Sequence, residues 1–316
     1  MESGASVAHD FAGACKLFAD EHLPYDVIVE ENLSPESLLP LRVVVVPNTI
    51  SLHPQTVRRL RDWCEEGGLL VFDYRTATHD HQGRSAAEPG FGLVEVNDDY
   101  PAKVSFVKPV FDIDSPFLRL NGITRFRTDP TALTLGLLTP SALEETDERW
   151  VSHKIHPGAP TNTAAAVLGS RGKGAFVYYS WRPFKELLAT DLRAIRQFVR
   201  HSLEKRYEPT LILEAPRTVE MIPYRTAGGF RVFLTNAVVG RPAGPCTPTY
   251  GANPAPHINL DFVLPVHDLQ LRIRSAVKKA RDMHGRALHL AHDGVWCEVT
   301  VPKIEQYEIV DIGINA

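Results

Sequence analysis

The residues best placed for chemistry follow two predicted strands, at the points where those strands end. Asn48 comes just after the β-branched run at residues 42–46, and Tyr74 and Arg75 come just after the apolar run at residues 69–72. In parallel α/β sheets, ligands bind outside the carboxyl ends of the strands. We therefore expect Asn48, Tyr74 and Arg75 to line a crevice there, in which Arg75 could clamp a carboxylate or a phosphate. The alternative is a vestigial crevice that a loop fills.

Trp181 is a fourth ligand-binding candidate, because it follows the aromatic strand predicted at residues 176–179. An exposed tryptophan at that point could stack on a sugar ring, whereas a buried one would belong to the core. The pattern alone favours core packing.

Motifs for covalent catalysis and for phosphate binding are missing from the sequence. It contains neither Gly-x-Ser-x-Gly nor Gly-x-Cys-x-Gly, and no Gly-x-Gly-x-x-Gly. The segment GSRGKG at residues 169–174 lacks the spacing of a phosphate loop and predicts a hairpin turn instead. Asp112, Asp114 and the acidic run at residues 144–148 do not provide the two differently tuned carboxylates that glycoside hydrolysis needs. The sequence therefore assigns no catalytic residue.

The densest group of possible metal ligands is His79-Asp80-His81. Two histidines and an aspartate could bind zinc, but the sequence places no further ligand beside them. We expect a solvated loop here, with no metal site, and we expect no cofactor.

Composition places the chain among globular proteins and limits its partners. It has 316 residues, of which 44% are hydrophobic and 23% charged, with a formal net charge of −4. This charge gives no electrostatic reason to expect nucleic acid or an anionic membrane as a partner. No apolar run approaches the ~20 residues of a membrane span, and the N-terminus lacks the features of a signal peptide. The four cysteines are far apart, which suits a reducing compartment, so we expect a cytoplasmic protein.

The first domain, residues 1–207, is predicted to be α/β. Residues 55–66 have the apolar spacing of a helix, end at Gly67-Gly68, and lie between two apolar runs. This strand–helix–strand pattern predicts a parallel sheet that contains residues 27–29, 43–46 and 69–72. Residues 1–10 contain no strand-like run, so the sheet lacks its usual first strand and should expose an edge. We also expect helices over residues 11–21 and 190–206 and a hairpin around residues 164–180.

The second domain, residues 208–316, is predicted to be a small antiparallel β-sandwich, because short strands recur at intervals of about 10 residues. A Pro- and Gly-rich insertion at residues 239–258 should form a long loop, and residues 275–279 should include the end of a hairpin. The expected strands cover residues 211–213, 219–223, 230–235, 269–273, 287–290, 295–301 and 307–312.

Several segments resemble the β-galactosidase trimerisation domain, a glutamine-amidotransferase-like module of family 42 glycoside hydrolases and of related fucosidase-like hydrolases. In the first domain they are GACKLFADEHLPYDVIVEENL, LRVVVVPNTISLHPQTVRRLRDWCEEGGLLVFDYRTATHDHQG, HPGAPTNTAAAVLGSRGKGAFVYYSW and LRAIRQFVRHSLEK. In the second, APRTVEMIPYRTAGGFRVFLTNAV and VPKIEQYEIVDI resemble the β-sandwich that closes such chains. The order of the segments is more specific than any one of them.

This resemblance implies a flavodoxin- or amidotransferase-like parallel sheet with flanking helices, followed by the small β-sandwich. In the resembling enzymes a (β/α)8 barrel of about 250 residues carries the catalytic carboxylates, and this chain has no room for one beside its two domains. The amidotransferase nucleophile is not matched either, because Cys64 lies inside a predicted helix.

The expected function is therefore that of a non-catalytic accessory or oligomerisation unit of a carbohydrate-active enzyme. Its partner would be a copy of itself or a separate subunit with a catalytic barrel. Two alternatives stay open. One is a free-standing glycoside hydrolase with its site at the strand ends, and the other is a module that binds a carbohydrate or another small ligand.

Overall fold

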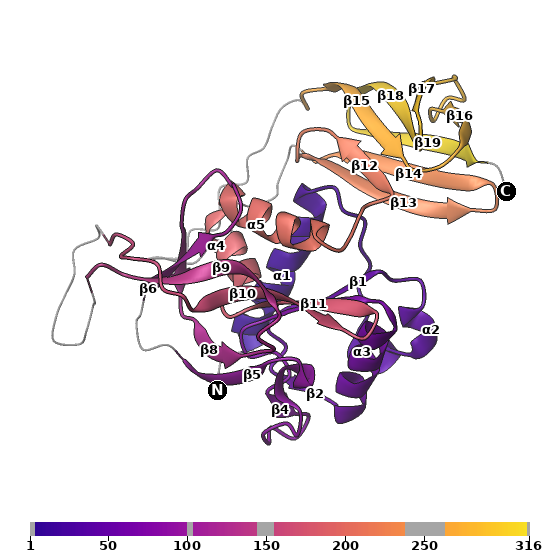
Figure 1. Ribbon diagram of the computed structural model, residues 1–316. Coiled ribbons are helices and arrows are strands. Elements are labelled where there is room, and N and C mark those ends of the chain that lie inside the picture. Colours follow the sequence, from indigo (N-terminus) through magenta and orange to yellow (C-terminus); the bar gives the residue numbers. More distant parts are fainter. Residues whose placement is uncertain (1–3, 100–103, 144–154, 238–262, 315–316) are drawn as a thin grey trace. The chain divides into compact units, whose positions relative to one another are not determined.

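The computed structural model describes residues 4–99, 104–143, 155–237 and 263–314, and its contacts divide the chain into two compact units (Figure 1). The first, which we call the α/β unit, comprises Met1–Ala14 and Val27–Tyr207. The second, the β unit, comprises Cys15–Asp26 and Glu208–Ala316. The predicted fold class, an α/β region followed by an antiparallel β-sandwich, is confirmed.

The α/β unit is built on a seven-stranded mixed sheet, of which only three neighbouring strands are parallel. These are the first three in the sheet, and antiparallel pairing begins at the hairpin that joins the third to the fourth. The turn of that hairpin is the GSRGKG segment, as predicted. The strand order is β1 (Val43–Val46), β3 (Leu69–Asp73), β11 (Gly174–Tyr179), β10 (Ala164–Arg171), β9 (Leu133–Pro140), β6 (Val104–Pro109) and β7 (Leu118–Asn121).

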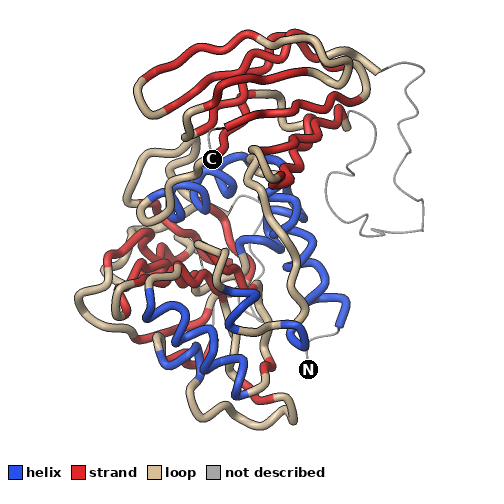
Figure 2. Tube along the Cα trace, turned by 90° about the vertical axis from the view of Figure 1, so that its right-hand side faces the viewer, coloured by secondary structure: helices blue, strands red, loops and turns tan. Residues whose placement is uncertain are grey.

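Helices cover both faces of the parallel strands. On one face, Val57, Leu60 and Cys64 of α3 (Pro54–Glu66) pack in one core cluster with strand residues such as Phe72. On the other face, Phe198 of α5 (Arg193–Glu204) contacts the ring of Tyr179. The helices are drawn in blue in Figure 2. As predicted, α3 ends at Gly67, whose φ of 135° suits glycine.

Two patterns in this unit gave predictions that were wrong in detail. Residues 27–29 form no strand and lie extended before the short helix η1 (Glu30–Asn32). The continuous β-branched run at residues 42–46 is typical of a strand buried on both faces, but β1 is only half-buried because it is an edge strand of the sheet. The helix predicted over residues 190–206 is confirmed as α5, and a separate helix that was not predicted, α4 (Pro183–Thr190), precedes it and ends at Asp191, which has a left-handed φ of 53°.

The helix predicted over residues 11–21 corresponds to α1 (Gly4–Asp20), which begins seven residues earlier and whose last six residues belong to the β unit. The remaining elements of the unit are short. They are α2 (Pro35–Leu38), β2 (Ser51–Leu52), β4 (His79–Asp80), η2 (Pro89–Gly92), β5 (Glu95–Asp99) and β8 (Thr124–Arg127).

The β unit consists of two four-stranded antiparallel sheets around one apolar core. The sequence analysis missed one strand, β16, because its basic residues were interpreted as a hairpin end. The insertion at residues 239–258 lies outside the described residues. The sheet orders are β12 (Leu211–Glu214), β15 (Val266–Ile273), β18 (Trp296–Ile304), β17 (His289–Asp293), and β13 (Val219–Thr226), β14 (Gly229–Asn236), β19 (Tyr307–Ile314), β16 (Val277–Arg281).

In the parts of the chain that the structure describes, no helix combines the length and apolar character needed to cross a bilayer.

Candidate functional site

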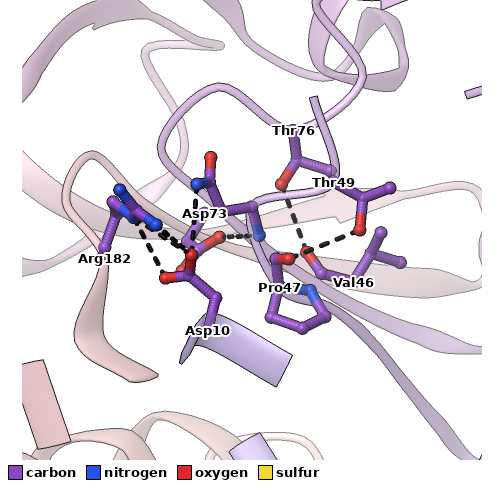
Figure 3. Close-up of polar contacts among 8 residues, drawn as sticks. Asp10, Val46, Pro47, Thr49, Asp73, Thr76 and Arg182 are labelled. Carbon is purple, nitrogen blue, oxygen red and sulfur yellow. Dashed lines mark hydrogen bonds and ion pairs between the residues drawn. The ribbon is translucent and has the colours of Figure 1, made fainter. Parts of the chain in front are cut away.

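The carboxyl ends of the three parallel strands bring together polar residues that are far apart in the sequence. Asn48 lies two residues after β1, Asp73 is the last residue of β3, and Arg182 lies three residues after β11. Because these strands are parallel neighbours, their ends meet at one edge of the sheet. Asp10 of α1 reaches the same point, as Figure 3 shows.

Asp10 is the centre of this cluster. It forms an ion pair with Arg182, whose Nε lies 3.1 Å from each carboxylate oxygen and whose Nη2 makes a further bond to Oδ2. The side-chain amide of Asn48 also donates to Asp10 Oδ2, at 3.2 Å. The backbone N–H of Asn48 donates to Oδ1 of Asp73. All four residues are buried, so the cluster is closed to solvent in this conformation.

The second carboxyl group, that of Asp73, is held in a different electrostatic state. Burial raises its pKa well above the ordinary value, and the neighbouring negative charge of Asp10 raises it further. Its Oδ2 has no hydrogen-bond partner among the described residues. Burial and the charge of Asp10 therefore both favour the protonated form of Asp73, in contrast to Asp10, which pairs with Arg182.

Tyr74 lies close to two guanidinium groups at this edge. Its ring centroid is 5.7 Å from Cζ of Arg75 and 6.0 Å from Cζ of Arg182. Its hydroxyl donates to Oδ1 of Asp99 (3.1 Å), and Arg75 donates to Oδ2 of the same carboxylate (2.8 Å). Tyr74 and Asn48 both have a left-handed φ, of 46° and 38°, which is uncommon outside glycine.

The structure therefore brings three of the four candidates from the sequence to one place. Asn48 is inside the cluster, Tyr74 is nearly buried beside it, and Arg75 is partly exposed. Trp181 does not join this cluster and packs against other aromatic rings. It is 1% exposed, and its ring lies 5.4 Å from that of Tyr179 and 5.5 Å from that of Phe198, so in this conformation it does not face solvent.

Sequence reasoning missed the three charged members, Asp10, Asp73 and Arg182. Asp73 had a usable signal, since a carboxylate directly follows four apolar residues of a buried strand. Asp10 had none, because one aspartate within a helix is usually a solvated residue.

Among the described residues, the threonine hydroxyls that follow these strands bond to backbone carbonyls and are not positioned as nucleophiles. The hydroxyls of Thr49 and Thr76 donate to the backbone carbonyls of Pro47 and Val46, at 3.3 and 3.2 Å (Figure 3). Cys64 lies inside α3 and its thiol donates to the carbonyl of Ala175 at 3.1 Å. Burial raises the pKa of that thiol to about 11, so little thiolate forms near neutral pH.

The other residues that the sequence analysis considered as metal ligands or catalytic carboxylates form local contacts or lie at the surface. Asp80 accepts from the backbone N–H groups of Gln82 and Arg84 and from the Arg84 guanidinium. Across the described ranges, no group of three or more His, Cys, Asp or Glu side chains could hold a metal ion. Asp114 forms an exposed ion pair with Arg193. The acidic run at residues 144–148 is outside the described residues.

Comparison with known proteins gives similarity in structure only. No family model and no curated protein matches the sequence. The whole chain superposes on 46% of α-L-fucosidase isoenzyme 2 from Paenibacillus thiaminolyticus, with a TM-score of 0.75 and 15% identity. It also superposes on 37% of Gan42B, a GH42 β-galactosidase from G. stearothermophilus, with a TM-score of 0.61 and 15% identity. For the β-galactosidase from Bacillus circulans sp. alkalophilus, 99% of this chain covers 39% of that one, with a TM-score of 0.60 and 14% identity.

The chain thus spans less than half the length of each of these three structures. At such low identity the similarity shows the fold alone. The same fold occurs within these glycoside hydrolases. This agrees with the resemblance of the sequence to glycoside hydrolases in general, without identifying the trimerisation domain.

Proposed function

We propose that this chain is a non-catalytic accessory unit of a carbohydrate-active enzyme. In this proposal, residues 1–207 form a domain of the β-galactosidase trimerisation type, related to amidotransferases, and residues 208–316 form the closing β-sandwich. The unit associates with copies of itself, or with a separate chain that carries a catalytic barrel and whose active site it supports.

The observation that carries the proposal is the closed cluster at the strand ends. In an α/β fold this edge is where a catalytic site is expected. Here Asp10 and Arg182 neutralise each other, Asn48 has no nucleophilic atom, and Asp73 is inaccessible to solvent. A buried ion pair of this kind holds α1 against the sheet, which is a structural task.

Association is supported by an apolar surface on the segment that precedes β1. Val29 is 53% exposed and Leu39 is 84% exposed. The neighbouring strand β1 is an edge strand, with β3 as its one partner within the described sheet. Exposed edges and apolar residues together are typical of surfaces that bind another chain.

Light scattering on the full chain tests the association. We expect a dimer or trimer at high micromolar concentration, and we expect Val29→Asp combined with Leu39→Asp to dissociate it. Leu192→Asp is the matched control, since Leu192 is also a half-exposed apolar residue of the α/β unit but lies at the start of α5. A monomer that also retains no partner on co-purification from its native cells would overturn the proposal.

Activity assays test the non-catalytic part. The isolated chain should not hydrolyse aryl galactosides, aryl fucosides or glutamine above background. Turnover that disappears in Asp10→Asn or Asp73→Asn while the variant stays folded would show that the cluster is an active site, and would favour the free-standing hydrolase.

A further inference from the structure

The outer face of the sheet β13-β14-β19-β16 carries aromatic and basic side chains in ordered rows. Val232 and Val310 of this sheet belong to the core of the β unit, so the alternate residues of each strand point outward. The pairing register then sets which outward residues are neighbours across the strands. One row is Tyr224, Arg231, Asp311 and Arg281, and the row beside it is Ile222, Phe233 and Ile309.

The apolar part of this face is exposed. Tyr224 is 58% exposed, and its ring centroid lies 5.5 Å from that of Phe233 in an edge-to-face arrangement. Ile222, opposite Phe233 in the register, is also exposed. The exposed side chains of Tyr224 and Ile222 thus border the half-buried ring of Phe233, and an apolar patch of this kind is typical of a binding surface.

A fixed ion pair borders the rings. Arg231 donates from Nε to Oδ1 of Asp311 at 2.7 Å and from Nη2 to Oδ2 at 2.9 Å. The remaining N–H groups of Arg231 are left for a ligand, because the guanidinium has five and this pair uses two.

Two further cations of the face have no such partner. Arg281 lies opposite Asp311 in the register, and Lys279 lies opposite Gly313 in the next row. The stem of Lys279 lies close over Gly313, since a Cβ at Gly313 would be 2.8 Å from Lys279 Cε. Among the described residues, neither Arg281 nor Lys279 forms an ion pair with a carboxylate, so the face carries excess positive charge on a chain whose net charge is −4.

We propose that this face binds an acidic oligosaccharide, one whose sugars carry carboxylate or sulfate groups. A sugar ring stacks on the exposed ring of Tyr224, which Phe233 supports edge to face, and the acidic groups pair with Arg231, Arg281 and Lys279. Three strand spacings of about 4.8 Å separate Tyr224 from Arg281, so the ligand spans about three sugar units. The rings favour a glycan over an acidic peptide, and the unpaired cations favour an acidic glycan over a neutral one. The proposal goes beyond the accessory role and does not depend on the strand-end cluster or on self-association.

Titration calorimetry on the full chain tests it with matched ligands. The probes are trigalacturonate, its neutral methyl ester, a sulfated galactotriose and a hexa-aspartate peptide. We expect saturable binding of one or both acidic trisaccharides, weakened by added salt, and about tenfold weaker binding of the methyl ester. Which acidic sugar binds identifies the anionic group.

Two variants separate the roles of the rings and the cations. Tyr224→Ala should weaken the binding of every trisaccharide about tenfold. Lys279→Ala combined with Arg281→Ala should reduce acidic ligands to the affinity of the methyl ester and leave the ester unchanged. Lys303→Ala, in the other sheet of the unit, is the control and should change nothing, and circular dichroism confirms that each variant is folded.

Three results would overturn the inference. They are no saturable binding of either acidic trisaccharide, equal affinity for trigalacturonate and its ester, and hexa-aspartate binding that matches the sugars and survives Tyr224→Ala.

Discussion

Asp10 and Arg182, 172 positions apart in the chain, form an ion pair that is almost completely shielded from solvent. A buried pair of charges is costly to desolvate, and its attraction offsets that cost only where further hydrogen bonds complete it. Here the amide of Asn48 supplies one such bond to Asp10. The pair links α1 to the loop after β11, at the edge of the sheet where a related fold could hold a ligand.

Breaking this pair should strongly destabilise the α/β unit. Arg182→Ala leaves Asp10 as an unpaired buried charge, a change that costs about 3–5 kcal/mol in such sites. Urea denaturation followed by circular dichroism measures the loss. Arg193→Ala is the control, because Arg193 forms an exposed ion pair with Asp114 and the change should cost at most about 1 kcal/mol. Equal losses in the two variants would contradict this account of the cluster.

Asp73 should make stability fall as pH rises. Its pKa is raised in the folded chain, so the folded state keeps a proton that the unfolded state releases above its ordinary pKa of 3.8. The stabilising contribution is therefore complete below about pH 4 and is lost as pH rises through the folded pKa. We expect Asp73→Asn, which still accepts from the Asn48 N–H, to flatten this part of the pH profile. Parallel profiles for the two proteins, compared by urea midpoints, would show that Asp73 is ionised in both states.

The sequence predicted the scaffold of this site better than its chemistry. Local signals were sufficient for α3, whose apolar spacing and terminal Gly67 are contained in the segment itself. They were sufficient also for most strands of the β unit, where inward and outward residues alternate. They failed for residues 27–29, because whether an extended segment pairs with a neighbour depends on distant strands.

The cluster shows a different limit. Asn48 and Tyr74 could be placed at the sheet edge because strand direction fixes where a strand ends. Asp10 could not, because its role depends on how α1 packs over an edge formed by residues much later in the chain. Trp181 was ambiguous for the same reason, since only the packing of α5 decides that its ring is enclosed.

His22 should have the opposite effect to Asp73, in the β unit. Burial lowers its pKa below 6.5, and its Nδ1 lies 3.0 Å from the carbonyl oxygen of Leu213, to which it donates when protonated there. The unfolded state then binds the proton more readily, so the contribution is present above about pH 6.5 and is lost as pH falls through the folded pKa. His22→Asn, which tolerates the φ of 53° at this position, should remove that loss. Thermal melts of both proteins between pH 5 and 7 measure this difference. An equal loss of stability in the two proteins as the pH falls would contradict the role of His22.

Cys64 should be unreactive in the folded protein. Its thiol is fully buried and its pKa is raised to about 11, so neither access nor ionisation favours alkylation. Iodoacetamide at neutral pH, followed by mass spectrometry, should modify Cys64 only after denaturation, and Cys64→Ala should leave any partner binding unchanged. Labelling of the native protein at the rate of a free thiol would show that this part of α3 opens.

Gly13 should be intolerant of the smallest substitution. In an ordinary exposed helix position, Gly→Ala stabilises by about 1 kcal/mol. At Gly13 of α1, however, a Cβ would lie 1.9 Å from the backbone carbonyl oxygen of Phe184 in α4, so the helices must separate to admit it. We therefore expect Gly13→Ala to destabilise the α/β unit, and the displacement of α1 to loosen the contact of Asp10 with Arg182. Ala8→Gly is the control for helix propensity, because Ala8 is an exposed residue of the same helix. This substitution should cost about 1 kcal/mol. A Gly13→Ala protein as stable as the wild type in urea would mean that α1 does not pack this closely on α4.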